Sequence, residues 1–421
     1  MVRNMTGYRD LARNHDFTVL WIGQTISELG SRVSMFVFPL LAYQLTGSAL
    51  VAGAAEAVHL LGLAGTLLPA GVLADRLDRR RLMRWASGSG VLLYGSLVVA
   101  GLADALTVPH LLVVALLTGA GSGLFAPAEV SAVRAVVPTD DLPTALSQNQ
   151  ARQHIAGLVG GPLGGLLYGV ARWLPFAADA VSFAVSWVLL GRIRMDLSAP
   201  AHTRPRRRAR EEIVEGLRYL GSRPFFRVLV VWAALINLTV NALFFVAILR
   251  LIEGGFQPVQ IGLVETVAGI SGILGAIVAP WVIDRFPTGW LTVTVGWTFV
   301  PLVVPMVLWN NPAVVAAALG LGLFLNPAGN AGIGAYRIAV TPPELQGRIQ
   351  STMQFVSMSV MPLSPVLAGL LLAGLGGGPA VAVLGGLTAL VALIPTLSRT
   401  VRQVPRPRDW VTPSKEPVPA A

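Results

Sequence analysis

The chain has 421 residues, of which 54% are hydrophobic and only 12% are charged. Soluble domains carry about twice that share of charged residues, so the composition excludes an ordinary soluble protein and indicates a membrane protein. The net charge of +10 would fit a nucleic-acid-binding protein, but the basic residues are spread between apolar runs, and we therefore expect no nucleic-acid partner. Cysteine is absent, which excludes disulfides, thiol catalysis and cysteine-bound metals.

About twelve apolar runs follow one another along the chain, each close to the length of a membrane-spanning helix. They are residues 17–43, 49–72, 82–103, 110–133, 155–170, 173–191, 225–249, 261–283, 290–309, 313–335, 353–375 and 380–397. Arginine-rich connections alternate with connections that carry almost no charge. By the positive-inside rule the arginine-rich side, which includes both termini, faces the cytoplasm.

The longest polar connection, residues 192–224, divides the chain into two halves, residues 1–191 and 225–398. This linker carries five arginines between Arg204 and Arg210. The pattern after them predicts a short amphipathic helix on the inner membrane surface, beside anionic lipids. The final stretch, residues 399–421, is rich in proline, and we expect a disordered cytoplasmic tail.

The two halves repeat each other in sequence. Residues 131–148 match residues 334–351 at one constant offset, which aligns Arg134 with Arg337 and Asp141 with Glu344. We therefore predict two related six-helix halves. In transporters built from such repeats the substrate site lies between the halves, near the middle of the bilayer.

A dense charge cluster, residues 71–81, joins the second and third runs. Its order, Gly-x-Leu-Ala-Asp-Arg-x-x-Arg-Arg, resembles the loop between helices 2 and 3 of major facilitator superfamily transporters, although Asp78 stands where many members carry glycine. The resemblance covers the whole chain and implies an all-α membrane protein of twelve transmembrane helices in two pseudo-symmetric halves. It also implies a conformational switch that contains Gly71, Asp75, Arg76, Arg79 and Arg80, with Glu129 and Arg134 joining it as a cytoplasmic latch. The alternative is a solvated loop whose arginines only set the topology.

Three further stretches, residues 20–30, 178–183 and 215–219, resemble the twelve-span drug/proton antiporter branch, which includes macrolide and siderophore exporters. This resemblance implies a monomeric secondary exporter of a drug, antibiotic, siderophore or other secondary metabolite. It would work by alternating access and proton antiport in the bacterial cytoplasmic (inner) membrane. The alternatives are an importer or facilitator, and a sensor or scaffold that does not transport. No motif of a common enzyme or ATP-binding site is present, so we expect no enzyme activity and no cofactor or metal.

The fifth run carries a glycine-proline motif made of Gly157, Gly161, Pro162 and Gly165. Glycines four residues apart form a smooth helical face, and the proline bends the helix. Tight helix packing alone would explain the pattern, whereas the resemblance adds that exporters of the superfamily carry such a motif in helix 5. The arginine followed by Gln-Gly that many proton antiporters carry in helix 4 is missing, because Gly119 and Ala120 stand there.

Ionisable residues within the apolar runs are costly, so each is a functional candidate. Glu28 lies near the middle of the first run with Arg32 one turn beyond it, and Glu56 lies in the second run. We expect these three residues to couple proton movement to transport, with a fixed Glu28–Arg32 pair as the alternative. Asp179 and Glu265 lie in the sixth and eighth runs. The candidates for a substrate cavity, or for hydrogen bonds between helices, are Gln24, Asn237, Asn241, Asn326 and Asn330.

Overall fold

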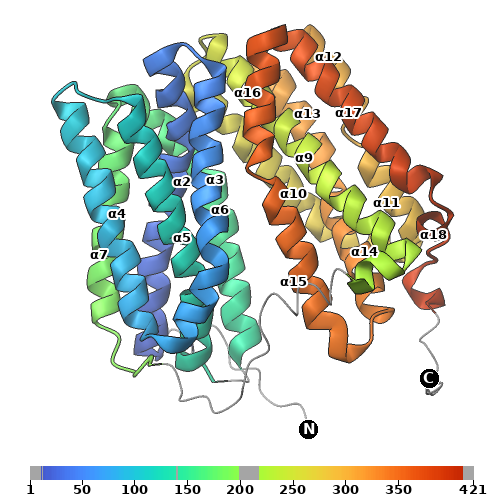
Figure 1. The fold of residues 1–421 in the computed structure, drawn as a ribbon, viewed down its shortest axis with the longest axis horizontal. Helices are drawn as coiled ribbons and strands as arrows, with labels where there is room; N and C mark the ends of the chain where they lie inside the picture. Colours follow the sequence, from blue (N-terminus) through green and yellow to red (C-terminus); the bar gives the residue numbers. More distant parts are fainter. Residues whose placement is uncertain (1–10, 12, 139–140, 199–217, 411–421) are drawn as a thin grey trace. The chain divides into compact units, whose positions relative to one another are not determined.

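A computed structural model describes residues 11, 13–138, 141–198 and 218–410 of the chain. Within these residues the regular structure is helical, without any β-strand (Figure 1). The six helices of the first half are α2 (His15–Thr46), α3 (Ala49–Arg76), α4 (Arg79–Leu102), α5 (Val108–Val136), α6 (Leu142–Val170) and α7 (Leu174–Gly191).

The helix ends in this half follow from their capping residues. The Asn14 side chain accepts a hydrogen bond from the Phe17 N–H at the start of α2, and Ser48 caps α3 in the same way. Helix α2 ends at Gly47, which adopts a left-handed φ of 65° that glycine takes without strain. Asp78, the residue that departs from the superfamily loop, caps α4 by accepting from the Arg80 N–H at 2.8 Å.

The second half contains more, shorter elements. They are α9 (Pro224–Glu253), α10 (Pro258–Arg285), α11 (Thr288–Trp297), α12 (Val303–Leu308), α13 (Pro312–Phe324), α14 (Asn326–Ala339), α15 (Pro343–Val360), α16 (Leu363–Leu375), α17 (Gly377–Leu397), α18 (Arg399–Arg402) and the 3₁₀ turn η2 (Pro407–Asp409). Three of the predicted spans are each interrupted, between α11 and α12, α13 and α14, and α15 and α16. Pro301, Pro327 and Pro362 lie at these interruptions, where each lacks the N–H that would continue the helix. Counting each interrupted pair once and leaving the short α18 aside, the described helices form the twelve predicted segments, and the all-α fold is confirmed.

Nine stretches of the described helices are long and apolar enough to cross a membrane by length and composition alone. Of the other three segments, α2 carries Glu28 and Arg32, and α6 begins with a polar stretch that contains Arg152. The last consists of α11 and α12, which are 10 and 6 residues long. Polar content therefore separates α2 and α6 from the other spans, and both helices contribute to the site described below.

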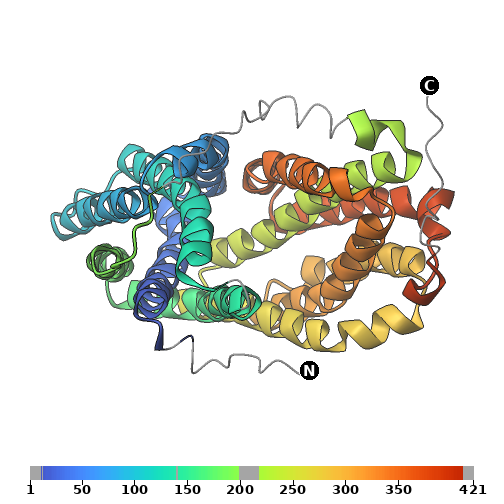
Figure 2. The same ribbon diagram turned by 90° about the horizontal axis from the view of Figure 1, so that it is seen from below.

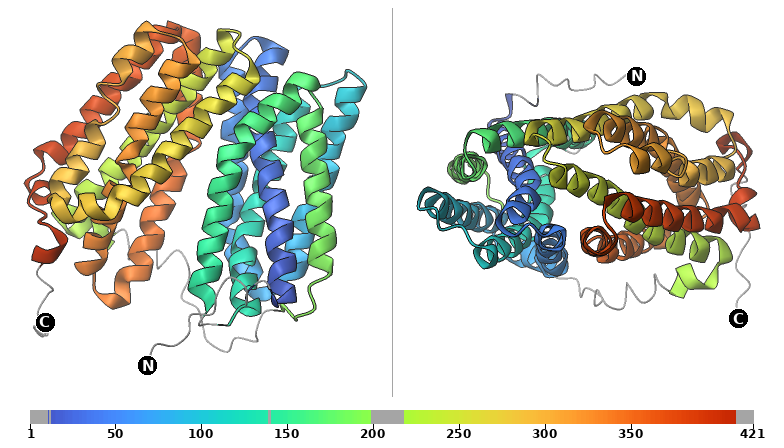
Figure 3. Two further views of the ribbon diagram at one scale, coloured as in Figure 1. Left: turned by 180° about the vertical axis from the view of Figure 1, so that it is seen from behind. Right: turned by 90° about the horizontal axis from the view of Figure 1, so that it is seen from above.

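The chain forms two compact units. Unit 1 comprises residues 1–203, 248–266 and 365–374, and unit 2 comprises residues 204–247, 267–364 and 375–421. In unit 1, α3 packs mainly along α5, α2 packs along α6 and α7, and α4 packs along α5 and α7 (Figure 3). Helices α3 and α5 approach so closely that a Cβ on Gly119 would lie 2.0 Å from the His59 carbonyl oxygen. Only glycine fits at such a contact.

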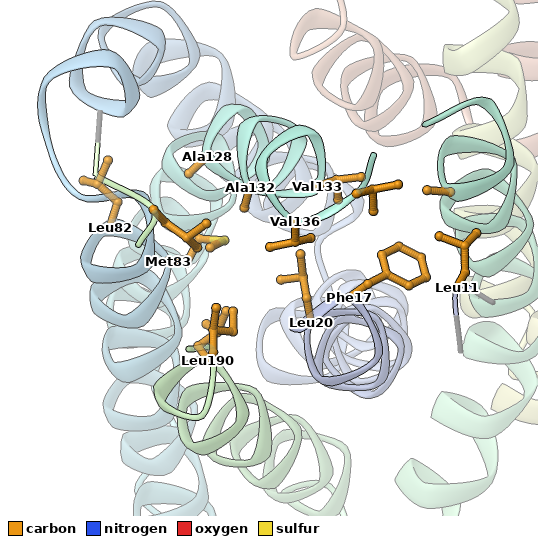
Figure 4. Packing of buried hydrophobic residues seen from close by; sticks show 14 residues of the cluster. Leu11, Phe17, Leu20, Leu82, Met83, Ala128, Ala132, Val133, Val136 and Leu190 are labelled. Carbon is orange, nitrogen blue, oxygen red and sulfur yellow. The ribbon is translucent and has the colours of Figure 1, made fainter. Parts of the chain in front are cut away.

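A layer of buried apolar side chains, most of them from α2, α4, α5 and α7, packs together at one end of unit 1 (Figure 4). The Asn14 side chain donates to the Val136 carbonyl at 2.7 Å, and Asp16 accepts from the Arg194 and Met195 N–H groups at 3.0 and 2.9 Å. The start of α2 is therefore tied both to α5 and to the segment after α7. The labelled members of the layer are Leu11, Phe17, Leu20, Leu82, Met83, Ala128, Ala132, Val133, Val136 and Leu190.

In unit 2, α11 packs against α14 and α17, and α12 packs against α13 and α17 (Figure 2). The segment from Arg399 to Trp410, which we expected to be disordered, instead forms α18 and η2 on the start of α11. The Gly289 N–H donates to the Val404 carbonyl at 3.0 Å, and a Cβ on Gly289 would lie 2.0 Å from the Val401 carbonyl oxygen. This segment therefore packs directly on the backbone of Gly289, where a side chain would not fit. Amino-acid composition alone does not reveal this contact.

The remaining domain boundaries stay predictions. Residues 411–421 and most of the predicted amphipathic helix of the linker lie outside the described residues.

Candidate transport site

An ion pair lies within helix α2 of unit 1. Arg32 Nε donates to Glu28 Oε1 at 3.0 Å, across the one-turn spacing that the sequence shows. The Glu28 side chain is 25% exposed and that of Arg32 is 42% exposed. The pair is therefore only partly buried by the packing of the helices.

Two further glutamates, Glu56 and Glu265, interact electrostatically with Arg32. Glu56 on α3 is buried, with 8% of its surface exposed, and Glu265 on α10 is partly buried. Glu56 interacts electrostatically with both Glu265 and Arg32, and Glu265 interacts with Arg32. Arg32 thus contacts Glu28 on α2 directly, and the carboxyl groups of Glu56 on α3 and Glu265 on α10 lie within electrostatic range of its guanidinium group. We call Glu28, Arg32, Glu56 and Glu265 the acidic cluster.

The glycine-proline motif of α6 lies against this cluster. A Cβ on Gly160 would lie 2.4 Å from Arg32 Cβ, and a Cβ on Gly161 would lie 2.9 Å from Glu265 Oε2. Thr266 Oγ1 donates to the Leu158 carbonyl at 2.6 Å, and Gly165 faces the backbone of Pro258. The smooth face of α6 therefore makes room for α10 and for the Glu265 carboxylate.

The other motif residues are placed differently. Helix α6 runs without interruption through Pro162, and no described atom lies within 4 Å of a Cβ on Gly157. Gly157 therefore does not serve close packing in the described part of the chain.

Asp179 is fully buried on α7. Its Oδ1 accepts from Ser182 Oγ at 2.9 Å, and the hydroxyl groups of Ser34 and Tyr94 lie within hydrogen-bonding range of its carboxylate. Gly30 of α2 faces it, because a Cβ there would lie 2.6 Å from Asp179 Oδ1. The sequence marks Asp179 as an ionisable residue in an apolar run but indicates no partner for it. Gly30 on the facing helix is the residue that makes room for Asp179, but no rule of sequence spacing relates the two positions.

A sequence model of the Major Facilitator Superfamily matches residues 20–288, more than half of the chain. The chain belongs to the major facilitator superfamily. The multidrug efflux pump Tap of Mycolicibacterium fortuitum is 26% identical over 360 residues, which cover 81% of this chain and 85% of that pump. The family assignment makes this protein a multi-pass membrane transporter of a small molecule, and not an enzyme.

Two solved structures share the superfamily fold. The nucleoside transporter NupG superposes with a TM-score of 0.73 at 10% identity, covering 90% of this chain and 98% of NupG. A bacterial homologue of the iron transporter ferroportin, in an inward-facing state, superposes with a TM-score of 0.70 at 16% identity, covering 93% of this chain and 99% of that protein. At these identities the likeness concerns the fold alone.

The superfamily loop between α3 and α4 is only partly described. The side chains of Gly71, Asp75 and Arg76 lie outside the described residues. The Arg79 N–H donates to the Leu197 carbonyl at 3.3 Å, and Arg80 Nη1 donates to the Ile193 carbonyl at 2.8 Å. These arginines therefore fix the segment after α7 to the start of α4, and the switch role of the loop stays a prediction.

Glu129 on α5 pairs with Arg152 on α6, where Arg152 Nη2 lies 2.7 Å from Glu129 Oε1. The Arg152 side chain is almost fully buried, and its Nε and Nη1 have no hydrogen-bond partner among the described residues. Arg134, expected to act together with Glu129, lies exposed on α5. The sequence does not single out Arg152, because its partner is 23 residues away on another helix.

The predicted cavity residues are engaged mainly within their own helices. Asn237 donates to the Ala233 carbonyl, Asn241 donates to the Asn237 carbonyl, and Asn330 donates to Asn326 Oδ1. Gln24 instead bridges two helices, since its Nε2 donates to Ser186 Oγ of α7 at 3.2 Å. Gln24 therefore has the interhelical contact that we weighed against substrate binding, and substrate binding by all five residues stays a prediction.

Proposed function

We propose that this transporter exports a small molecule in exchange for protons, by alternating access in a bacterial cytoplasmic membrane with both termini in the cytoplasm. The observation that carries the proposal is the acidic cluster, in which three carboxyl groups share a single arginine within the spanning helices. Unpaired charge is costly there, and binding a proton removes one negative charge. The similarity to a multidrug efflux pump over most of its length supports export as the direction.

The geometry of the cluster supports a specific coupling step. While Glu28 is ionised it holds Arg32 one turn away on the same helix, at 3.0 Å. Protonation of Glu28 removes the charge that attracts Arg32, and the guanidinium then interacts more strongly with Glu56 and Glu265. This exchange would strengthen the attraction of α2 for α3 and α10. Proton binding would thereby bias the packing of these helices, as a two-state switch requires.

The excess of carboxyl groups also points to a class of substrate. A cationic molecule, or one rich in hydrogen-bond donors, can replace Arg32 or a proton beside Glu56 and Glu265. Competition between such a substrate and protons for the same carboxylates is the simplest basis for antiport. We therefore place cationic drugs, antibiotics and secondary metabolites first among the candidates, ahead of neutral siderophores.

The test is transport by the purified protein in sealed liposomes. With the interior acidified, protein that exposes its cytoplasmic face to the outside should take up a cationic substrate against its gradient while the interior pH rises. A matched set of liposomes without a pH gradient measures passive exchange. Movement of substrate and protons in the same direction would indicate a symporter, and absence of any flux across a broad panel of substrates would favour a sensor or scaffold.

A further inference from the structure

One end of helix α10 in unit 2 carries a charged pocket of about 430 Å³. Its lining residues are Trp281, Asp284, Arg285, Arg406 and Arg408. Three arginines stand against one aspartate, so the lining carries a net positive charge. We propose that this pocket binds the headgroup phosphate of an anionic membrane phospholipid.

The pocket is built from two segments that lie more than 100 residues apart. Helix α10 supplies Trp281, Asp284 and Arg285, and the C-terminal segment supplies Arg406 and Arg408. That segment is held in place by the hydrogen bonds to Thr288 and Gly289 at 3.3 and 3.0 Å. The ring of Trp410 adds an edge contact to Tyr336, with the centroids 5.5 Å apart. The two distal arginines are therefore positioned by the fold and do not belong to a free tail.

The arginines in the pocket have spare hydrogen-bonding capacity. The Arg285 guanidinium carbon lies 5.7 Å from the centre of the Trp281 ring, and Arg408 Nε lies 3.9 Å from Asp409 Oδ2. Among the described residues, neither Arg285 nor Arg406 has a carboxylate within 4 Å. Guanidinium groups bind phosphate oxygens through paired N–H donors, so one phosphate could satisfy donors from both segments.

The surroundings favour a lipid over a free anion. The pocket lies where the span Pro258–Arg285 ends. The large side chains of Trp281, Phe286 and Trp290 are exposed there, by 60%, 47% and 52%. Exposed aromatic rings at the end of a span are typical of the membrane–water boundary. A phosphate held there can keep its acyl chains in the adjoining hydrocarbon, and basic pockets at this depth bind anionic headgroups.

The test measures binding of phosphatidylglycerol to the purified full-length protein by native mass spectrometry. We expect one site that saturates, with no comparable site for zwitterionic phosphatidylcholine. The combined variant Arg285→Gln, Arg406→Gln and Arg408→Gln should weaken this binding about tenfold or more. A matched variant removes the three exposed arginines Arg192, Arg194 and Arg227 and should keep the site.

A variant that is expected to bind the lipid more tightly controls for loss of binding through misfolding. Asp284→Asn removes the single negative charge from the lining and should tighten phosphatidylglycerol binding, which a damaged protein cannot do. Equal losses in the two triple variants would show that general surface charge attracts the lipid, and would overturn the proposal. Equally effective competition by soluble glycerol phosphate would show a free-anion site, and would also overturn it.

Discussion

Asp179 lies fully buried between α7 and α2, and Gly30 provides the space for its carboxylate. An added methyl group at Gly30 would lie 2.3 Å from Ser182 Oγ and 2.6 Å from Asp179 Oδ1, so both side chains must move or the two helices must separate. We predict that Gly30→Ala lowers the stability of the protein by about 1–3 kcal/mol, the usual cost of overpacking. Thermal unfolding in detergent measures this effect.

The matched control is Gly157→Ala, in the middle of α6, where nothing described lies within 4 Å of the added methyl group. This substitution should leave the unfolding temperature unchanged or raise it slightly, because alanine favours the helix. If both variants lose the same stability, helix flexibility accounts for the effect and contact with Asp179 does not.

The ion pair between Glu129 and Arg152 is a second place where one side chain strongly affects the stability of the protein. Removing one partner of a buried pair leaves an uncompensated charge, which costs about 3–5 kcal/mol. We predict that Glu129→Gln is strongly destabilising because the Arg152 side chain is 2% exposed. The double variant Glu129→Gln with Arg152→Met should recover much of the loss in thermal unfolding. If the double variant instead loses the sum of what Glu129→Gln and Arg152→Met lose separately, the two residues do not act as a pair.

At the scale of elements, the sequence predicts best what is local. Span lengths and the one-turn spacing of Glu28 and Arg32 each lie within one helix, so the sequence alone indicates them. The interruptions near Pro301, Pro327 and Pro362 were not predicted, because membrane helices tolerate proline and its presence does not show where a helix stops. Docking of the segment Arg399–Trp410 was missed for a related reason, since the surface that receives it is the backbone of Gly289.

The contacts between helices that form the candidate site could not be predicted from sequence patterns. Glu56 and Glu265 lie about 200 residues apart in the chain. The hydrophobic periodicity of each helix does not show which other helix it will contact. The glycine-proline motif predicted a close helix contact at Gly161 but not that α10 and Glu265 would fill it. The sequence therefore identifies most of the ionisable residues, and the structure shows which of them interact electrostatically with one another.

At the scale of the whole molecule, the proposed topology puts alternate connections on opposite sides of the membrane. Because the chain has no native cysteine, single introduced cysteines report on this directly. We predict that cysteine in place of Arg172 or Gly377 reacts with a membrane-impermeant thiol reagent in intact cells. Cysteine in place of Ser198 should react only after the cells are opened. Labelling of Ser198→Cys in intact cells would reverse the proposed orientation.

We propose that Glu28 carries the proton that drives export. In sealed liposomes, Glu28→Gln should abolish substrate accumulation driven by a pH gradient and keep exchange of substrate when no gradient is present. Such a split separates loss of coupling from loss of folding or binding. Adding Arg32→Gln should not restore accumulation, because the proton site is still missing.

The most direct measurement is therefore gradient-driven accumulation by three proteins side by side: the native chain, Glu28→Gln, and Glu28→Gln with Arg32→Gln. The proposal predicts accumulation by the native chain alone, with passive exchange in all three. Full accumulation by the double variant would contradict it, because the pair would then only brace α2. Full accumulation by Glu28→Gln alone would also contradict it and would leave Glu56 as the residue to test next.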